Sequence, residues 1–145
     1  MAGYSERSLV QKLGITPGST IAILNAPRGY RTTLGKLPAG VVVLTAARGR
    51  LRLIHFFATR ERALAARFPS LARALISDGA LWISWPKRAA KVPTDLTETV
   101  VRAVGLRYGL VDVRVCAVDD VWSGLKFVRR LKDRGSRSDF TRQST

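Results

Sequence analysis

Short apolar segments alternate along the chain with stretches of helical periodicity. Six segments are apolar throughout or alternate apolar with polar positions, a pattern typical of β-strands. They are residues 20–24, 41–44, 51–57, 80–85, 111–118 and 121–128. Pro27 follows the first segment and Pro86 follows the fourth, where a residue that cannot donate a strand hydrogen bond ends the pairing. Gly79 is expected to open the fourth strand.

Four helices are expected before and between these strands. They cover residues 5–13, residues 29–34, a segment that begins near residue 59 and a segment that begins near residue 94. Ser5 is suited to cap the first helix, and Gly14 and Gly35 are suited to end the first two. Pro69 is expected to break or kink the third helix near Phe68.

The fourth helix has the clearest start signal. Thr94 or Asp95 is expected to cap it, with Glu98 three residues after Asp95 as in a capping box. Helical and strand periodicity together predict a buried core, in which we place Phe68, Leu71, Leu75, Ile83, Val101, Val104 and Val113.

The order of these elements predicts the fold class. Strands and helices alternate over most of the chain, which favours a three-layer, Rossmann-like α/β sandwich with a mainly parallel sheet. The last two strands are joined by too short a connection for a crossover, so we expect an antiparallel C-terminal hairpin at a sheet edge. A length of 145 residues favours one domain, placed at residues 1–131, with a flexible basic tail at 132–145.

Charge adds information about function, because the sequence holds 25 basic and only 10 acidic residues, which give a net charge of +15. Residues 1–72 alone hold 11 basic and 2 acidic side chains. Most of the basic residues are arginines, whose planar guanidinium suits phosphate. The first half therefore indicates a polyanion-binding surface, with Arg48, Arg50 and Arg52 as candidate nucleic-acid contacts. The alternative is a compositional bias that also keeps the protein in solution.

Several classes of protein are excluded by what the sequence contains. One Cys and one His cannot build a disulfide framework or a Cys/His zinc site, so no metal site is expected. The sequence contains no apolar run long enough for a membrane span, no secretory signal, and neither a dinucleotide-binding nor a phosphate-loop motif, so we expect a cytoplasmic protein without a cofactor. Cys116 and His55 form the only candidate catalytic pair, and both fall in apolar strands, where structural roles explain them better.

One candidate ligand site follows from the predicted topology. Ligands of open α/β sheets bind beyond the carboxyl ends of the strands. That rule brings together residues near the ends of three strands and the start of the fourth helix: Asn25, Tyr30, His55, Phe57, Trp85, Lys87, Arg88, Lys91 and Thr94. Lys87, Arg88 and Lys91 are expected to bind a sulfate, phosphate or carboxylate with the N–H groups of that helix. The alternative is that the tryptophans pack in the core and the cations are solvated.

Several segments resemble an uncharacterised bacterial family of small single-domain proteins. The early ones are Lys12-Leu13-Gly14-Ile15 with Pro17-Gly18, Leu24-Asn25-Ala26-Pro27 with Tyr30, and Leu53-Ile54-His55. The later and more specific ones are Leu81-Trp82-Ile83-Ser84-Trp85-Pro86-Lys87, Thr94-Asp95-Leu96 and Val121-Trp122-Ser123-Gly124-Leu125-Lys126-Phe127-Val128. The resemblance covers nearly the whole chain and implies no activity.

The order of elements over residues 51–128 is also distantly similar to that of Rossmann-like methyltransferases. Asn25-Ala26-Pro27-x-x-Tyr30 superficially resembles the Asn-Pro-Pro-Tyr motif of amino-methyltransferases, which normally follows a later strand. The methyltransferases also place a glycine-rich turn after the first strand and an acidic residue at the end of the second. This chain has Gly29 alone in the first place and Leu44-Thr45-Ala46-Ala47 in the second. We therefore expect no measurable binding of S-adenosylmethionine.

These observations leave three functional hypotheses. The first is a non-catalytic domain that binds a polyanion such as nucleic acid, with no membrane partner. The second is a small-molecule enzyme or sensor that uses the crevice at the strand ends. The third is a subunit of an assembly, such as a homodimer formed through Trp122 and the final hairpin.

Overall fold

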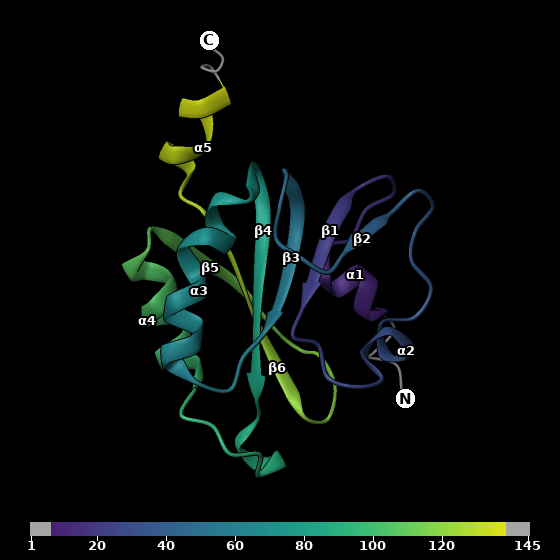
Figure 1. Cartoon of the computed structure of the whole chain (residues 1–145), viewed down its shortest axis with the longest axis vertical. Coiled ribbons are helices and arrows are strands. Elements are labelled where there is room, and N and C mark those ends of the chain that lie inside the picture. The colour runs from purple at the N-terminus through teal and green to yellow at the C-terminus, as the bar shows by residue number, and fades with distance from the viewer. Residues whose placement is uncertain (1–6, 139–145) are drawn as a thin grey trace.

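The computed structural model describes residues 7–138, which build a six-stranded sheet in the order β2-β1-β3-β4-β6-β5. The strands are β1 (Thr20–Leu24), β2 (Val42–Leu44), β3 (Leu51–Phe57), β4 (Leu75–Pro86), β5 (Leu110–Ala117) and β6 (Trp122–Arg129). The first four are parallel to one another, and β6 runs antiparallel between β4 and β5 (Figure 1). The predicted α/β class, the mainly parallel sheet and the C-terminal hairpin at its edge are confirmed.

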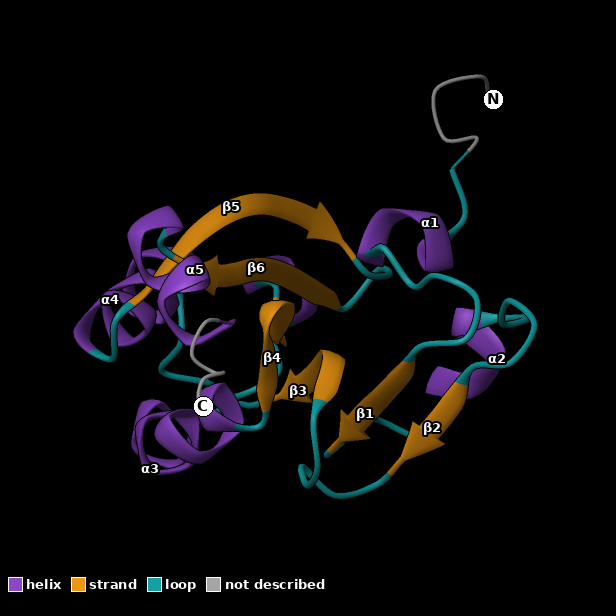
Figure 2. Cartoon of the chain, turned by 90° about the horizontal axis from the view of Figure 1, so that it is seen from above, coloured by secondary structure: helices purple, strands orange, loops and turns teal. Residues whose placement is uncertain are grey.

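Helices cover both faces of the sheet. Figure 2 shows α3 (Glu61–Arg73) and α4 (Glu98–Arg107) on one side, and α1 (Leu9–Leu13) and α2 (Tyr30–Leu34) on the other. The larger core lies under α3 and α4 and includes Phe56, Phe68 and Phe127. The smaller core lies under α1 and α2 and includes Trp82, whose indole N–H donates to the carbonyl of Leu13 at 2.9 Å. That bond fixes the end of α1 on the sheet.

Burial agrees with the predicted core at every position except one. The six buried residues are Phe68, Leu71, Leu75, Ile83, Val101 and Val104. Val113 is 54% exposed, and its prediction is wrong. The register between β5 and β6 shifts between Asp112 and Arg114, which disturbs the inward and outward alternation that the sequence pattern assumed.

Two helix starts differ from the expectation. Ser8, not Ser5, caps α1 through a capping box with Gln11, and Ser5 lies outside the described residues. Thr97, not Thr94 or Asp95, caps α4 and accepts from the Val100 N–H at 3.2 Å.

Pro69 does not break its helix, and Gly79 does not open its strand. Helix α3 continues through Pro69 to Arg73, since Leu71 remains buried on the sheet and holds the last turn in place. Strand β4 begins at Leu75, so Gly79 lies inside it. A Cβ at Gly79 would lie 2.9 Å from the carbonyl oxygen of Leu51, and this close approach of two strands explains the glycine.

The remaining helices are short. A 3₁₀ turn, η2 (Arg88–Ala90), follows β4, and α5 (Leu131–Ser138) forms where the flexible tail was expected to begin. Residues 139–145 of that tail lie outside the described residues. Within residues 7–138, every helix is too short or too polar to cross a bilayer.

Candidate functional site

The loop that follows β4 lines a cavity of about 490 Å³ at the carboxyl end of that strand. The residues around it are Trp85, Pro86, Lys87, Arg88, Val92, Thr94, Leu96, Thr97, Glu98 and Ser123. The structure thus brings four of the predicted site residues together: Trp85, Lys87, Arg88 and Thr94. The N-terminus of α4 also faces this cavity, as expected, because Thr97 and Glu98 belong to its first turn.

Most polar groups around this cavity are already used by the fold. The Thr94 hydroxyl donates to the carbonyl of Thr59 at 2.6 Å and accepts from the Leu96 N–H at 3.0 Å. The N–H of Lys87 donates to the carbonyl of Val121 at 2.7 Å. Glu98 forms an ion pair with Arg102. The side chains of Lys87 and Arg88 remain as the cationic groups that a ligand in this cavity would meet.

Lys91 does not line the cavity, so the predicted convergence of three cations reduces to two. Lys91 follows η2 in the left-handed conformation, with φ of 59°, and its side chain is exposed. A carboxylate, that of Glu98, shares the cavity with the two cations. The electrostatic preference for an anion is weaker than the sequence implied.

Tyr30 and His55 lie in a different place, inside the core beneath α2. The phenol oxygen of Tyr30 lies 2.6 Å from Nδ1 of His55, and Nε2 of His55 lies 2.7 Å from the hydroxyl of Ser84. The three side chains are at most 2% exposed, and the ring of Phe57 stacks on His55 at 4.2 Å. Burial lowers the pKa of His55 to about 3 and raises the pKa of Tyr30. The three residues form a neutral hydrogen-bonded chain enclosed in the core.

Ser84 is the member of this chain that sequence reasoning missed. It sits in the run Leu81-Trp82-Ile83-Ser84-Trp85 as the one hydroxyl, and His55 is the one titratable residue in the apolar run Leu53-Ile54-His55-Phe56-Phe57. Two polar residues in buried neighbouring strands need partners, and pairing them was the available signal. The hydrogen bond between His55 and Ser84 joins β3 to β4.

Asn25 lies on the surface beyond the end of β1, outside the cavity at β4. Its φ is 58°, and the chain then turns so that the Tyr30 N–H bonds to the carbonyl of Pro27 at 3.1 Å. The single crevice expected from the sequence is therefore divided. Trp85, Lys87, Arg88 and Thr94 share one cavity, while Asn25, Tyr30, His55 and Lys91 lie outside it.

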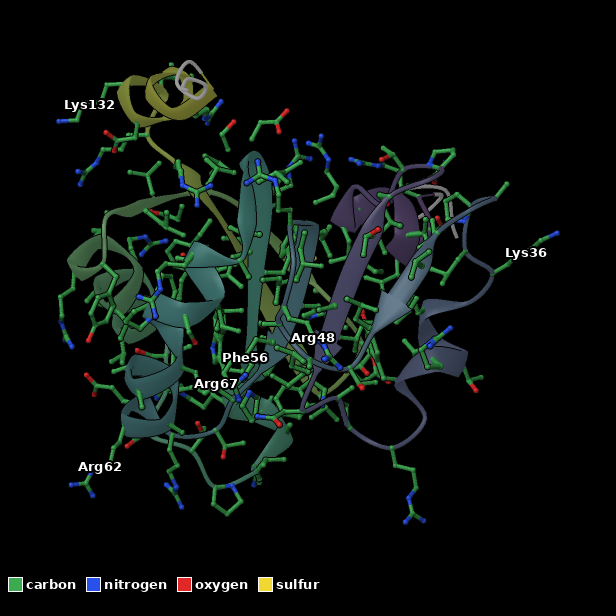
Figure 3. The ribbon with its side chains drawn as sticks, turned by 45° about the horizontal axis from the view of Figure 1, so that its top comes forward. Lys36, Arg48, Phe56, Arg62, Arg67 and Lys132 are labelled. Carbon is green, nitrogen blue, oxygen red and sulfur yellow. The ribbon has the colours of Figure 1, made fainter. Side chains whose placement is uncertain are left out.

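The three arginines proposed to contact nucleic acid also differ from one another. Arg48 and Arg50 are exposed in the loop before β3, whereas Arg52 forms an ion pair with Asp78 at 3.2 Å. In Figure 3, Lys36, Arg62 and Lys132 extend outward from the periphery, while Arg67 reaches from α3 over the ring of Phe56, with 5.4 Å between guanidinium carbon and ring centre. The basic side chains are thus spread over several elements.

The described residues contain no group of acidic, Cys and His side chains that could hold a metal ion. His55 lies on β3 and Cys116 on β5, with β4 and β6 between them in the sheet. The arrangement gives no support to a Cys–His catalytic pair.

Similar solved structures identify the fold. Magnesium protoporphyrin IX methyltransferase of Synechocystis PCC 6803 with bound S-adenosylhomocysteine is 14% identical, with 84% of this chain and 78% of that chain covered and a TM-score of 0.58. A SAM-dependent methyltransferase of Aquifex aeolicus is 14% identical over 82% of this chain and 86% of that chain, also at 0.58. The fibrillarin pre-rRNA processing protein of Methanococcus jannaschii is 12% identical over 79% of this chain and 68% of that chain, at 0.51.

The chain therefore has the Rossmann-like α/β fold of the SAM-dependent methyltransferases. No protein-family model matches the sequence, and no curated protein sequence does either. Likeness at this level of identity concerns the fold and leaves the activity open.

The residues after β1 fit S-adenosylmethionine poorly. Pro27 has no N–H to offer a ligand, and the N–H groups of Tyr30 and Thr33 are bonded to the carbonyls of Pro27 and Gly29. Ala26 and Pro27 carry side chains where a close backbone approach requires glycine. Helix α2 is only five residues long, and β2 ends at Leu44 without a carboxylate.

Proposed function

We propose that this protein is a non-catalytic, cytoplasmic domain that binds a polyanion, with nucleic acid as the leading candidate, through the arginine-rich surface of its first half. The observation that carries this proposal is the distribution of ion pairs. Within residues 7–72, Glu61 is the only carboxylate, and it lies 3.9 Å from Arg107 of α4. Arg52 is the one basic residue of that segment with an acidic partner among the described residues.

The remaining basic side chains of residues 7–72 thus present positive charge that the described part of the protein does not neutralise. They include Arg28, Arg31, Arg48, Arg50, Arg60 and Arg62, all of them exposed. Guanidinium groups bind phosphate oxygens in parallel hydrogen bonds, and each phosphate contact releases counterions from a nucleic acid. A surface of this composition favours binding that weakens steeply with salt.

A salt titration tests the proposal with Arg48 and Arg50 as the probes. We expect short duplex and single-stranded nucleic acids to bind with a steep dependence of log K on log salt concentration, measured by fluorescence anisotropy. The variant Arg48→Gln/Arg50→Gln should reduce the magnitude of that slope by about 2 if both side chains contact phosphates.

The matched control is Arg73→Gln/Lys132→Gln, which removes the same charge from exposed positions on α3 and α5. This control should leave the slope unchanged. Absence of binding near about 100 mM salt, or an equal effect of both double variants, would contradict the proposal.

The cavity of about 490 Å³ beside Trp85 supports a second candidate, a small-molecule enzyme or sensor. Its volume falls in the range of small-molecule sites, and Lys87 and Arg88 favour an anionic ligand. A thermal-shift screen with nucleotides distinguishes the candidates, because a ligand at 100 times its Kd stabilises a protein by about 2.7 kcal/mol. A shift abolished by Arg88→Gln would favour this second function.

We also propose that the chain belongs to the uncharacterised bacterial family that its segments 81–87 and 121–128 resemble. In this fold the first segment lies along β4 and the second along β6, and Pro86 is paired with Trp122. The two segments therefore form one pair of neighbouring strands beside the cavity.

A further inference from the structure

A second cavity, of about 310 Å³, lies between α1 and the outer strand β5 on the face of the sheet opposite α3 and α4. The described residues that line it are Arg7, Lys12, Arg114, Val115, Cys116 and Ala117. Three of them are cationic and none is acidic. This distinguishes it from the cavity at the end of β4, where Glu98 balances part of the charge.

The cations are held in place by the fold. Lys12 lies in the last turn of α1, whose end is anchored by the bond from Trp82 to Leu13. The Arg7 guanidinium donates to the carbonyl of Gln11 at 3.2 Å. Arg114 stands on β5 directly opposite Lys126 of β6.

The Arg114–Lys126 pair is the most informative feature. Like charges directly opposite across two strands destabilise a sheet. Lys126 is half-buried, and both that burial and the nearby Arg114 hold the pKa of its ammonium group below the usual value. Burial raises the pKa of the Cys116 thiol, while Lys12 and Arg114 act in the opposite direction, consistent with a positive potential between α1 and β5.

We propose that this cavity is a binding site for a phosphate monoester dianion, held by Lys12 and Arg114 with Arg7 at its rim and Lys126 beside it. A bound dianion would offset the electrostatic repulsion between Arg114 and Lys126. The forked guanidinium of Arg114 matches two phosphate oxygens. The volume lies at the lower end of ligand cavities, which suits a group the size of a nucleotide or smaller. This site is separate from Arg48 and Arg50, so it stands or fails independently of the proposed function.

Calorimetric titration at constant ionic strength tests the site with three probes: inorganic phosphate, adenosine 5′-monophosphate and an oligonucleotide with no terminal phosphate. We expect the first two to bind wild-type protein with Kd below about 1 mM, and Lys12→Gln and Arg114→Gln each to weaken that binding at least about tenfold. Arg73→Gln/Lys132→Gln should bind both with unchanged affinity.

A second measurement distinguishes the loss of a binding site from misfolding of the variant. In phosphate-free buffer, Arg114→Gln should raise the melting temperature by about 1–4 °C, because it removes the repulsion with Lys126. Unchanged phosphate affinity in both single variants, or an equal loss in the Arg73→Gln/Lys132→Gln control, would overturn the proposal. So would failure of both inorganic phosphate and adenosine 5′-monophosphate to bind while the oligonucleotide binds, which is the result expected if the protein binds nucleic acid through Arg48 and Arg50 alone.

Discussion

At the scale of single residues, His55 is the most unusual feature of the molecule. Its imidazole accepts or donates one hydrogen bond on each side, and either neutral tautomer can serve Tyr30 and Ser84. The side chain is 1% exposed, so the charged form would have to give up its hydration in the core. His55 therefore contributes to stability as a neutral group.

This neutral state predicts a pH dependence of stability. The pKa of His55 is about 3 in the folded protein against about 6.5 when unfolded, so between these values the unfolded state binds a proton that the folded state does not. The free energy of unfolding should fall as the pH drops below about 6.5, by up to about 1.4 kcal/mol per pH unit. Urea unfolding at about pH 7, 6 and 5 measures it.

His55→Gln is the control, because His55 is the only histidine of the chain and carboxylates titrate mainly at lower pH. The variant should be less stable overall, and its free energy of unfolding should change little over the same range. A wild-type protein without the slope, or a variant with the same slope, would contradict this role of His55.

At the scale of elements, glycines at contact points set how closely helices and strands approach. Gly105 lies in the last turn of α4, where a Cβ would fall 2.0 Å from Cε1 of Phe127 on β6. Helix propensity alone would favour alanine by about 1 kcal/mol. The contact with the phenylalanine ring reverses that preference.

Gly105→Ala should therefore destabilise the protein by about 1–3 kcal/mol through overpacking. The matched control, Ala103→Gly, changes an exposed position of the same helix and should cost about 1 kcal/mol by propensity alone. Chemical denaturation of both variants decides the matter, and a more stable Gly105→Ala protein would show that α4 can move away from β6.

The buried faces of α3 and β4 give a second prediction at this scale. Leu71 and Ile83 are fully buried, so truncating either to alanine should cost about 2–5 kcal/mol in free energy of unfolding. Val113→Ala on the exposed part of β5 should stay within about 0.5 kcal/mol. Losses below about half a kcal/mol at both core positions would contradict the burial of these faces.

The same elements show what the sequence could predict. Strands β1 and β3 match their predicted ranges because both are mainly apolar runs of strand length with turn residues around them. The pattern failed at Pro69, Gly79 and Val113, where packing between elements outweighs local preference. Trp85, Lys87 and Arg88 were grouped correctly because they are neighbours in the chain. Lys12, Arg114 and Lys126 were missed because their proximity depends on strand register and on the placement of α1.

At the scale of the whole molecule, positive charge and a methyltransferase fold occur together. The sheet order provides the crevice at the carboxyl ends of the strands, where many α/β proteins bind their ligands. In this chain the part of the crevice at β4 differs from the part at β1. The side at β4 carries a cavity with Lys87 and Arg88, whereas at β1 the chain continues through Ala26 and Pro27, and the side chain of Tyr30 is buried in the core.

This difference predicts that S-adenosylmethionine does not bind measurably. The backbone after β1 offers no N–H at Pro27, and Ala26 and Pro27 carry side chains where a close backbone approach to a cofactor requires glycine. No carboxylate follows β2, where Leu44-Thr45-Ala46-Ala47 stands, and the phenol of Tyr30 is bound to His55 rather than available to a ligand. Isothermal titration of the full chain with S-adenosylmethionine and S-adenosylhomocysteine measures this directly. A dissociation constant below about 100 μM, near −5.5 kcal/mol, would contradict the prediction and make methyl transfer the leading functional hypothesis.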